Sequence, residues 1–287
     1  MTTTITDENA GTIGIGDRTV RRLGFGAMRI TGPGIWGPPA DHDEAIAVLR
    51  RAVELGVDLI DTADSYGPDV SEELIAEALH PYPDDLLIAT KGGLTRTGPN
   101  KWPRDGRPQH LREACEGSLR RLKLDTIDLY QHHSPDSEVP YEESISALRE
   151  LREEGKIRNI GVSNVSIEQL ETAREIVEVV SVQNRFNLTD RSSQDVLQRC
   201  EELGIAFLPW APVSRGELTE PGGPLDRIAS AHDAKPGQVA LAWLLARSAA
   251  MVPIPGTSSV EHLEENLAAA DLQLSAEELS ELEGAAD

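Results

Sequence analysis

The sequence predicts an α/β protein, a single (β/α)8 TIM barrel with an N-terminal β-hairpin and extra helices near the C-terminus. Three observations lead to this fold. Eight short apolar runs alternate with amphipathic helical segments from residue 23 onward. No linker or change of composition interrupts them, so we expect one domain over residues 1–287. Several of the runs end on a polar side chain, as barrel strands do where they carry a functional site.

The chain begins with alternating apolar and polar residues around a Gly16-Asp17 turn, which predicts a small hairpin over residues 12–20. The first barrel strand would be residues 21–26. It contains Gly24-Phe25-Gly26, but the third glycine of a dinucleotide fingerprint is missing and a proline-rich loop follows where a helix would be needed. A Rossmann fold is therefore disfavoured.

Helices and strands then alternate, with apolar side chains at helical spacing in the helices and nearly continuous apolar runs in the strands. We expect helices at 43–55, 71–79, 110–122, 141–154, 167–177, 193–203, 225–232, 237–247, 260–269 and 276–283. We expect strands at 57–61, 86–90, 126–130, 159–162, 180–182, 205–208 and 251–254. The last strand is the weakest, because Pro253 has no N–H to donate to a sheet.

Composition limits the partners and the compartment. The 27 basic and 49 acidic residues give a net charge of −22, which argues against binding nucleic acid or an anionic membrane surface. Cys115 and Cys200 fall in predicted helices and indicate reduced thiols. The first ten residues resemble no signal peptide, and no run of 18 apolar residues occurs. We expect a cytoplasmic monomer or weak homo-oligomer.

Four side chains at strand ends form a chemically coherent set: Asp61, Tyr66, Lys91 and one of His132 and His133. A tyrosine hydroxyl can donate a proton to a carbonyl oxygen while hydride reaches the carbon, but its usual pKa is about 10. A lysine cation nearby would lower that pKa, and an aspartate would keep the lysine charged. The histidine would polarise the substrate oxygen.

Each of these residues also has an ordinary interpretation, since aspartates often cap turns and lysines after strands are usually solvated. One alternative is a metal-dependent barrel hydrolase built on His132, His133 and Asp136. Adjacent side chains on a strand point to opposite faces, however, so the two histidines are poorly placed to bind one ion. We therefore expect no metal site.

The sequence resembles the aldo-keto reductases over nearly its whole length. The resemblance is carried by residues 23–26 (LGFG), 61–67 (DTADSYG), 89–91 (ATK), 128–135 (DLYQHHSP), 161–164 (GVSN) and 254–257 (IPGT). It implies an NADP-dependent enzyme acting on CH–OH or carbonyl groups, which reduces an aldehyde or ketone to an alcohol. The implied catalytic tetrad is Asp61, Tyr66, Lys91 and His133. His133 is preferred to His132 because it lies two residues before Pro135, as in the family motif.

The resemblance also implies a nicotinamide cofactor that lies extended across the barrel mouth. Ser163, Asn164 and Gln183 would bind its carboxamide, and Trp210 would stack on its ring. The positions matched to the pyrophosphate and adenosine are Ser214, Gly216, Gly256, Thr257, Ser258, His262, Glu265 and Asn266. Many members have cations at 256 and 262 for the 2′-phosphate. Ser258, Ser259 and a helix N-terminus could replace them, so we expect NADPH, with NADH as the alternative.

Within the family, residues 27–39 and 254–260 are similar to a bacterial branch that reduces pyridoxal to pyridoxine, which implies a small-molecule carbonyl substrate. The substrate pocket would be made by loops 30–39, 92–108 and 216–224. The second loop contains a basic group with one tryptophan: Arg96, Lys101, Trp102, Arg104 and Arg107. It is either a solvated loop or a lid over an aromatic or anionic substrate. A further alternative is a nicotinamide-binding redox sensor or partner subunit with little turnover.

Overall fold

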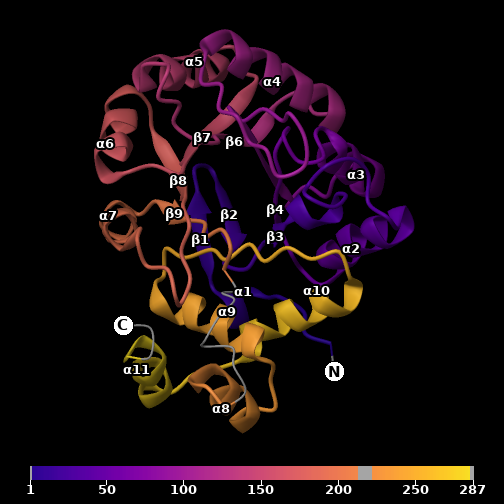
Figure 1. The fold of residues 1–287 in the computed structure, drawn as a ribbon, viewed down its shortest axis with the longest axis vertical. Coiled ribbons are helices and arrows are strands. Elements are labelled where there is room, and N and C mark those ends of the chain that lie inside the picture. The colour runs from indigo at the N-terminus through magenta and orange to yellow at the C-terminus, as the bar shows by residue number, and fades with distance from the viewer. Residues whose placement is uncertain (1, 213–221, 285–287) are drawn as a thin grey trace.

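The computed structural model describes residues 2–212 and 222–284. A parallel sheet curls around a central axis and helices cover its outer face (Figure 1). Among the described residues the sheet has seven strands, in the order of the chain. They are β3 (Phe25–Gly26), β4 (Leu59–Asp61), β5 (Leu87–Gly92), β6 (Ile127–His132), β7 (Ile157–Ser163), β8 (Val179–Gln183) and β9 (Ala206–Phe207).

The helices that follow the strands lie where the spacing of apolar residues predicts them, within one or two residues. They are α2 (His42–Glu54), α3 (Val70–Leu79), α4 (Pro108–Leu122), α5 (Tyr141–Glu153), α6 (Ile167–Ile176), α7 (Gln194–Leu203), α8 (Pro224–Ala231), α9 (Pro236–Arg247), α10 (Val260–Leu267) and α11 (Ala276–Gly284). Short 3-10 helices, η1 (Ala27–Ile30) and η3 (Ala268–Asp271), and the helix α1 (Asp7–Ala10) complete the helical segments described. The helix predicted over 260–269 thus divides into α10 and η3.

The helix ends have local causes. Ser166 begins α6 with a capping box, in which its hydroxyl accepts the Gln169 amide and the Gln169 side chain accepts the Ser166 amide. The Asp41 side chain caps α2 by accepting the amide of Glu44. Gly204, at a φ of 68°, ends α7 in the left-handed conformation that glycine adopts readily.

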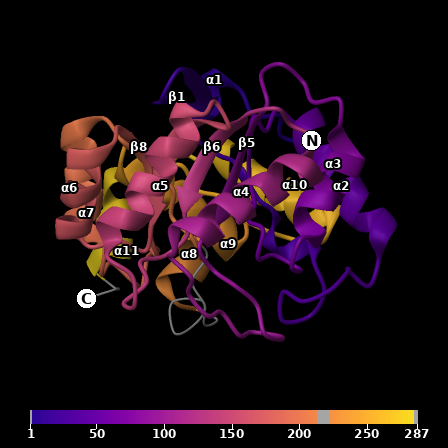
Figure 2. The ribbon, with the colours of Figure 1, turned by 90° about the horizontal axis from the view of Figure 1, so that it is seen from above.

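The predicted hairpin forms and closes one end of the barrel. Its strands β1 (Thr12–Ile15) and β2 (Arg18–Arg21) pair antiparallel, and in Figure 2 β1 and α1 lie together at one end of the molecule. Ile15 and Val20 are buried in the same apolar cluster as Leu59, Leu87 and other side chains of the barrel interior. The hairpin therefore seals the barrel at the end opposite to the carboxyl ends of the strands.

Residues 250–255, the closing segment, complete the barrel between β9 and β3. On one side the Phe207 amide donates to Ala250 O and the Val252 amide to Phe207 O, each at 2.8 Å. On the other side the amides of Gly24 and Gly26 donate to the carbonyls of Pro253 and Pro255, at 3.0 and 3.2 Å. The regular strand predicted at 251–254 is not formed, because prolines can accept but not donate in a ladder. The predicted eightfold closure is nevertheless made.

None of the helices described is long and apolar enough to span a lipid bilayer. The helices instead bury apolar faces against the outside of the sheet, in two clusters of side chains that surround the barrel. What positions the site is therefore the parallel register of the strands, whose carboxyl ends meet at one end of the barrel.

Candidate active site

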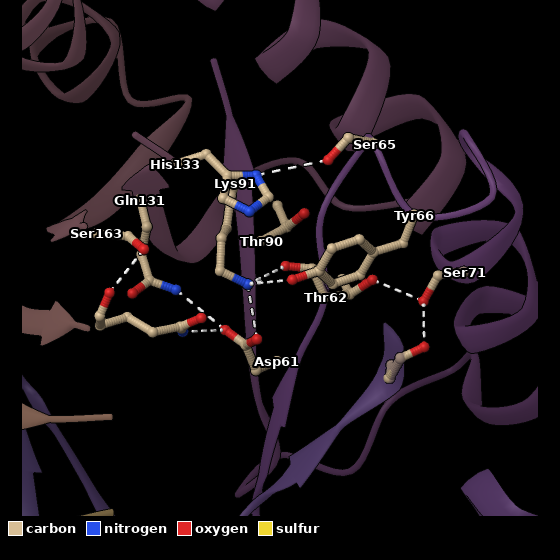
Figure 3. A network of polar contacts seen from close by, with 12 residues as sticks. Asp61, Thr62, Ser65, Tyr66, Ser71, Thr90, Lys91, Gln131, His133 and Ser163 are labelled. Atoms are coloured by element: carbon tan, nitrogen blue, oxygen red, sulfur yellow. Dashed lines mark hydrogen bonds and ion pairs between the residues drawn. The ribbon is translucent and has the colours of Figure 1, made fainter. Parts of the chain in front are cut away.

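The turn after β4 carries the residues from Thr62 to Gly67 across the end of β5. The Thr62 amide donates to Ala89 O at 2.8 Å, and the Asp64 amide donates to Lys91 O at 3.3 Å. Gly67, at a φ of 106°, then leads the chain into α3. Because of this crossing, Tyr66 lies beside Lys91, and its hydroxyl points towards the Lys91 ammonium (Figure 3).

Lys91 is the central group of the site and has no exposed surface. Its ammonium donates to Asp61 Oδ2 at 2.6 Å, to the Thr62 carbonyl at 2.8 Å and to the Tyr66 hydroxyl at 3.4 Å. Only 3% of the Asp61 side chain is exposed. An ammonium has three N–H donors, so every one has a partner here, which is what a buried charge requires.

Burial and the ion pair act in opposite directions on the titration of this group. Burial alone would lower the pKa of Lys91, but Asp61 and Tyr66 together raise that pKa above its usual value. The lysine is therefore charged at neutral pH. Burial raises the pKa of Tyr66; Lys91 opposes this rise, as the sequence predicts, but does not cancel it. The expected net lowering of the Tyr66 pKa is therefore wrong, and the hydroxyl keeps its proton at neutral pH.

The second carboxylate oxygen of Asp61 is held by two glutamines. Gln131 Nε2 donates to Asp61 Oδ1 at 3.1 Å, and Gln183 Nε2 donates to the same oxygen at 2.8 Å. The family resemblance assigns Gln183 to the cofactor and gives Gln131 no role. The sequence signal for Gln131 is the alternation along β6, which places its polar side chain on the inward face beside Leu129. These two amides fix the orientation of the carboxylate that pairs with Lys91.

The two histidines point to opposite sides of the sheet, as the alternation predicts. The ring of His133 lies 5.9 Å from the Tyr66 ring, edge to face, and its Nδ1 is 3.5 Å from Ser65 Oγ. Burial, then the Lys91 cation and then His132, hold the pKa of His133 well below its usual range. The imidazole is thus neutral, and its ring N–H can donate a hydrogen bond to an oxygen beside Tyr66.

His132 instead packs against Tyr141 of α5, with ring centroids 5.6 Å apart. It is fully buried, and neither ring nitrogen has a hydrogen-bond partner within residues 2–212 and 222–284. Burial lowers its pKa to about 4. Asp136 opposes this shift in the pKa of His132, and its carboxylate accepts the amides of Gly106 and Glu138. In the described part of the chain, no three His, Cys, Asp or Glu side chains are grouped so that they could hold a metal ion.

Four residues predicted to bind the cofactor form one network beside His133. Asn164 Nδ2 donates to the His133 carbonyl at 3.0 Å and to Ser163 Oγ at 3.1 Å, and Ser163 Oγ donates to the Gln183 carbonyl at 2.7 Å. Trp210 Nε1 donates to Asn164 Oδ1 at 3.0 Å. The indole is thereby held at the carboxyl end of the barrel with part of its surface exposed.

The remaining cofactor positions form a second group, beyond the closing segment. Gly256, Thr257 and Ser258 follow that segment, and α10 carries His262, Glu265 and Asn266. A Cβ on Gly256 would lie 2.5 Å from the Gly26 carbonyl, so closure of the barrel itself requires glycine here. Glu265 forms an ion pair with Lys235. Ser214 and Gly216 lie outside the described residues.

The chain is similar to known proteins over nearly its whole length. The model of the aldo/keto reductase family matches residues 22–287. The chain is 50% identical to an uncharacterised oxidoreductase of Schizosaccharomyces pombe, over 96% of this chain and 89% of that one. It is 43% identical to pyridoxine 4-dehydrogenase of Escherichia coli, over 96% and 98%.

Solved structures agree in fold. A glycerol dehydrogenase from Gluconobacter oxydans superposes with a TM-score of 0.84 at 29% identity, covering 96% of this chain and 94% of that one. An aldo-keto reductase from Klebsiella pneumoniae, in complex with NADPH, superposes with a TM-score of 0.81 at 27% identity, covering 95% and 94%. Both likenesses extend over nearly the whole chain, so they include the strand ends that carry the site.

The opposite placement of the histidines predicts opposite effects of their removal. His133→Ala should lower the turnover of an aldehyde about a hundredfold to a thousandfold, since a hydrogen bond to a developing oxyanion contributes about 2.7 to 4 kcal/mol. His132→Ala should keep the turnover within a few-fold but lower the free energy of unfolding by roughly 2 to 5 kcal/mol, through the cavity it leaves. Steady-state kinetics on one substrate and thermal unfolding measure both; an inactive His132→Ala with an active His133→Ala would contradict the assignment.

A pH series separates the role of His132 further. Its pKa is about 4 when folded and near 6.5 when unfolded, so the unfolded chain takes up the proton first. The wild type should therefore lose stability as the pH falls from about 6.5 towards 4, and His132→Ala should lose part of that slope. Identical slopes in the two proteins would show that His132 is not buried in its neutral form.

Proposed function

The chain belongs to the aldo/keto reductase family, and we propose that it reduces an aldehyde or ketone to an alcohol with Tyr66 as the proton donor. The observation that carries the proposal is the buried contact of Lys91 with both Asp61 and Tyr66. A protonated hydroxyl with a fixed cation beside it can give up its proton to a carbonyl oxygen, because the cation stabilises the tyrosinate that remains.

The proposed roles of the other residues follow from their contacts. Asp61, fixed by its two glutamines, keeps Lys91 charged and in place while the proton moves. The neutral ring of His133 lies beside Tyr66 and would donate a hydrogen bond to the substrate oxygen, which orients the carbonyl and stabilises the charge that develops there. His133 would not itself supply the proton, because its depressed pKa leaves it without a second one.

We propose NADPH as the cofactor, and its chemical contribution when bound is the hydride. The residues fit such a group: the Trp210 ring is held by Asn164 yet partly exposed, and amide and hydroxyl side chains adjoin it. Support comes also from the Klebsiella pneumoniae relative, whose structure is a complex with NADPH. Ser163, Asn164, Gln183 and Trp210 would hold the nicotinamide end, and the group on α10 would face the adenosine end.

Pyridoxal is the substrate that we favour. The relative named pyridoxine 4-dehydrogenase shares 43% of its residues with this chain. The chain also places the Trp102 ring 6.2 Å from Tyr66 in a T-shaped contact, so a flat aromatic aldehyde would find an aromatic neighbour at the proton donor. A carbonyl screen that includes pyridoxal, run with NADPH and with NADH, tests both the substrate and the cofactor.

A cytoplasmic location is also proposed, on the state of the thiols. Cys115 and Cys200 are free and buried, and burial raises the pKa of each to about 12. Cysteines that form no disulfide are typical of a reducing compartment.

Tyr66→Phe tests the proton donor. It removes only the hydroxyl, so we expect turnover to fall by at least about a hundredfold, the smaller end of the range for losing a general acid. Cofactor affinity should stay within a few-fold, and quenching of tryptophan fluorescence measures it, with Trp210 as the expected reporter. Near-normal turnover in this variant would remove Tyr66 from its role.

The adenosine end provides a separate prediction. The Val260 amide, the first of α10, donates to Glu44 Oε1 at 2.9 Å, and the Ser259 amide donates to Thr257 Oγ1 at 3.2 Å. Two of the amides expected to receive a 2′-phosphate are therefore engaged, one of them by a carboxylate. A phosphate bound at this helix end would meet that negative charge.

Glu44→Gln should therefore shift cofactor preference towards NADPH. The amide can still accept from Val260, but the charge is gone, so the affinity for NADPH relative to NADH should rise about two- to fivefold, the size of a charge effect at a helix N-terminus. Asp43→Asn removes one charge from the fully exposed neighbouring side chain and is the matched control. Fluorescence titration with both cofactors gives the ratio; an equal ratio in Glu44→Gln and the control would contradict the prediction.

A further inference from the structure

Arg96, in the loop of residues 93–107 between β5 and α4, makes an unusual set of contacts. Arginine has five N–H donors, and all five donate to backbone carbonyls. Nη1 donates to Ile35 O at 2.6 Å and to Ser65 O at 2.8 Å. Nη2 donates to Gly34 O at 2.9 Å and to Gly98 O at 3.3 Å, and Nε donates to Lys101 O at 3.0 Å. None of these acceptors is a carboxylate.

These carbonyls belong to three separate segments around Tyr66. Gly34 and Ile35 lie in the loop of residues 31–41 that precedes α2, Ser65 adjoins Tyr66 itself, and Gly98 and Lys101 lie in the loop of Arg96. A backbone contact also joins two of these segments: the Asn100 amide, in the loop of Arg96, donates to Gly34 O at 3.0 Å. Arg96 is thus a side chain that bonds to all three segments at once.

The guanidinium also supports an aromatic side chain. Its carbon lies 3.6 Å from the centroid of the Trp102 ring and 5.7 Å from that of Trp36. Trp102 in turn contacts the Tyr66 ring and packs with Met28 against the small cluster of Ile35, Ala63 and Tyr66. The position of the Trp102 indole beside Tyr66 therefore depends on the Arg96 guanidinium that packs against it.

These contacts distinguish Arg96 from the other basic residues of the loop. Arg96 is engaged in the interior of the loop, whereas Lys101, Arg104 and Arg107 are exposed and Arg107 pairs with Asp105. The solvated-loop interpretation thus describes the other basic residues of the group and fails for Arg96. Five backbone carbonyls and the Trp102 ring hold the Arg96 guanidinium, so this side chain has a structural role that a solvated arginine does not have.

We propose that Arg96 is a positioning residue, which fixes the two loops against the Ser65-Tyr66 turn and so holds the Trp102 ring where an aromatic carbonyl substrate packs beside Tyr66. The proposal rests on the proposed carbonyl reduction and specifies its substrate class. Small aliphatic aldehydes need the same proton donor but make little use of the indole. Loss of Arg96 should therefore separate the two kinds of substrate.

The kinetic test compares Arg96→Lys with Arg104→Lys, which makes the same change at an exposed position of the same loop. For an aromatic aldehyde such as pyridine-4-carbaldehyde, Arg96→Lys should lower kcat/KM about two- to tenfold, mainly through KM, since an aromatic contact contributes about 0.5 to 1.5 kcal/mol. For propanal kcat/KM should change by less than about twofold and by less than for the aromatic aldehyde, and Arg104→Lys should match the wild type on both. An equal loss on both aldehydes, or none, would overturn the proposal.

A double-mutant cycle tests whether Arg96 acts through Trp102. Trp102→Leu should reproduce the selective loss, and adding Arg96→Lys to it should then change kcat/KM for the aromatic aldehyde by less than about twofold. Fully additive losses would show that Arg96 acts by another route. Cofactor affinity, measured by fluorescence, should be unchanged in all of these variants.

Hydrogen exchange provides a readout that needs no turnover. In Arg96→Lys the amides of residues 34–37 and 98–102 should exchange at least about tenfold faster than in the wild type, with Arg104→Lys as control, because they lose the carbonyl anchors that order them. Unchanged exchange contradicts the role of Arg96. A wild type that reduces neither aldehyde contradicts the proposed function instead, so the two failures are distinguishable.

Discussion

The candidate active site depends on one buried ion pair, that of Lys91 and Asp61. Taking two charges out of water costs several kcal/mol per ion, and the cost is offset only where every donor and acceptor has a partner. The partners here come from four strands: Asp61 from β4, Lys91 from β5, Gln131 from β6 and Gln183 from β8. These four side chains meet only because the sheet curls into a barrel. The ion pair therefore depends on the barrel fold.

That pair also determines what the neighbouring groups can do. Burial, with a smaller contribution from Asp61, leaves Tyr66 protonated, and burial together with the Lys91 cation keeps His133 neutral. The result is a proton donor and a hydrogen-bond donor side by side, with a cation in contact with the first. Such an arrangement suits a reaction in which negative charge appears on an oxygen and is then quenched by a proton.

The sequence was sufficient for the architecture because periodicity reports which face of an element is buried. It therefore placed the helices and most strands, and it separated His132 from His133. It could not predict the Gln131 and Gln183 contacts with Asp61, the five carbonyls around Arg96 or Glu44 at the start of α10, since these join residues far apart in the chain. The closing segment was doubtful for a local reason, its prolines, which the barrel accommodates by using only their carbonyls. The catalytic roles themselves stay predictions.

The central claim is that the Lys91 cation makes Tyr66 a usable acid. The direct measurement is the pH dependence of kcat/KM for aldehyde reduction in the wild type and in Lys91→Met, with thermal unfolding as the check that both are folded. Without the cation the tyrosinate is less stable, so the loss of activity at high pH should move to still higher pH, and the rate below it should fall at least about a hundredfold. A variant that matches the wild type in both rate and pH profile would contradict the claim.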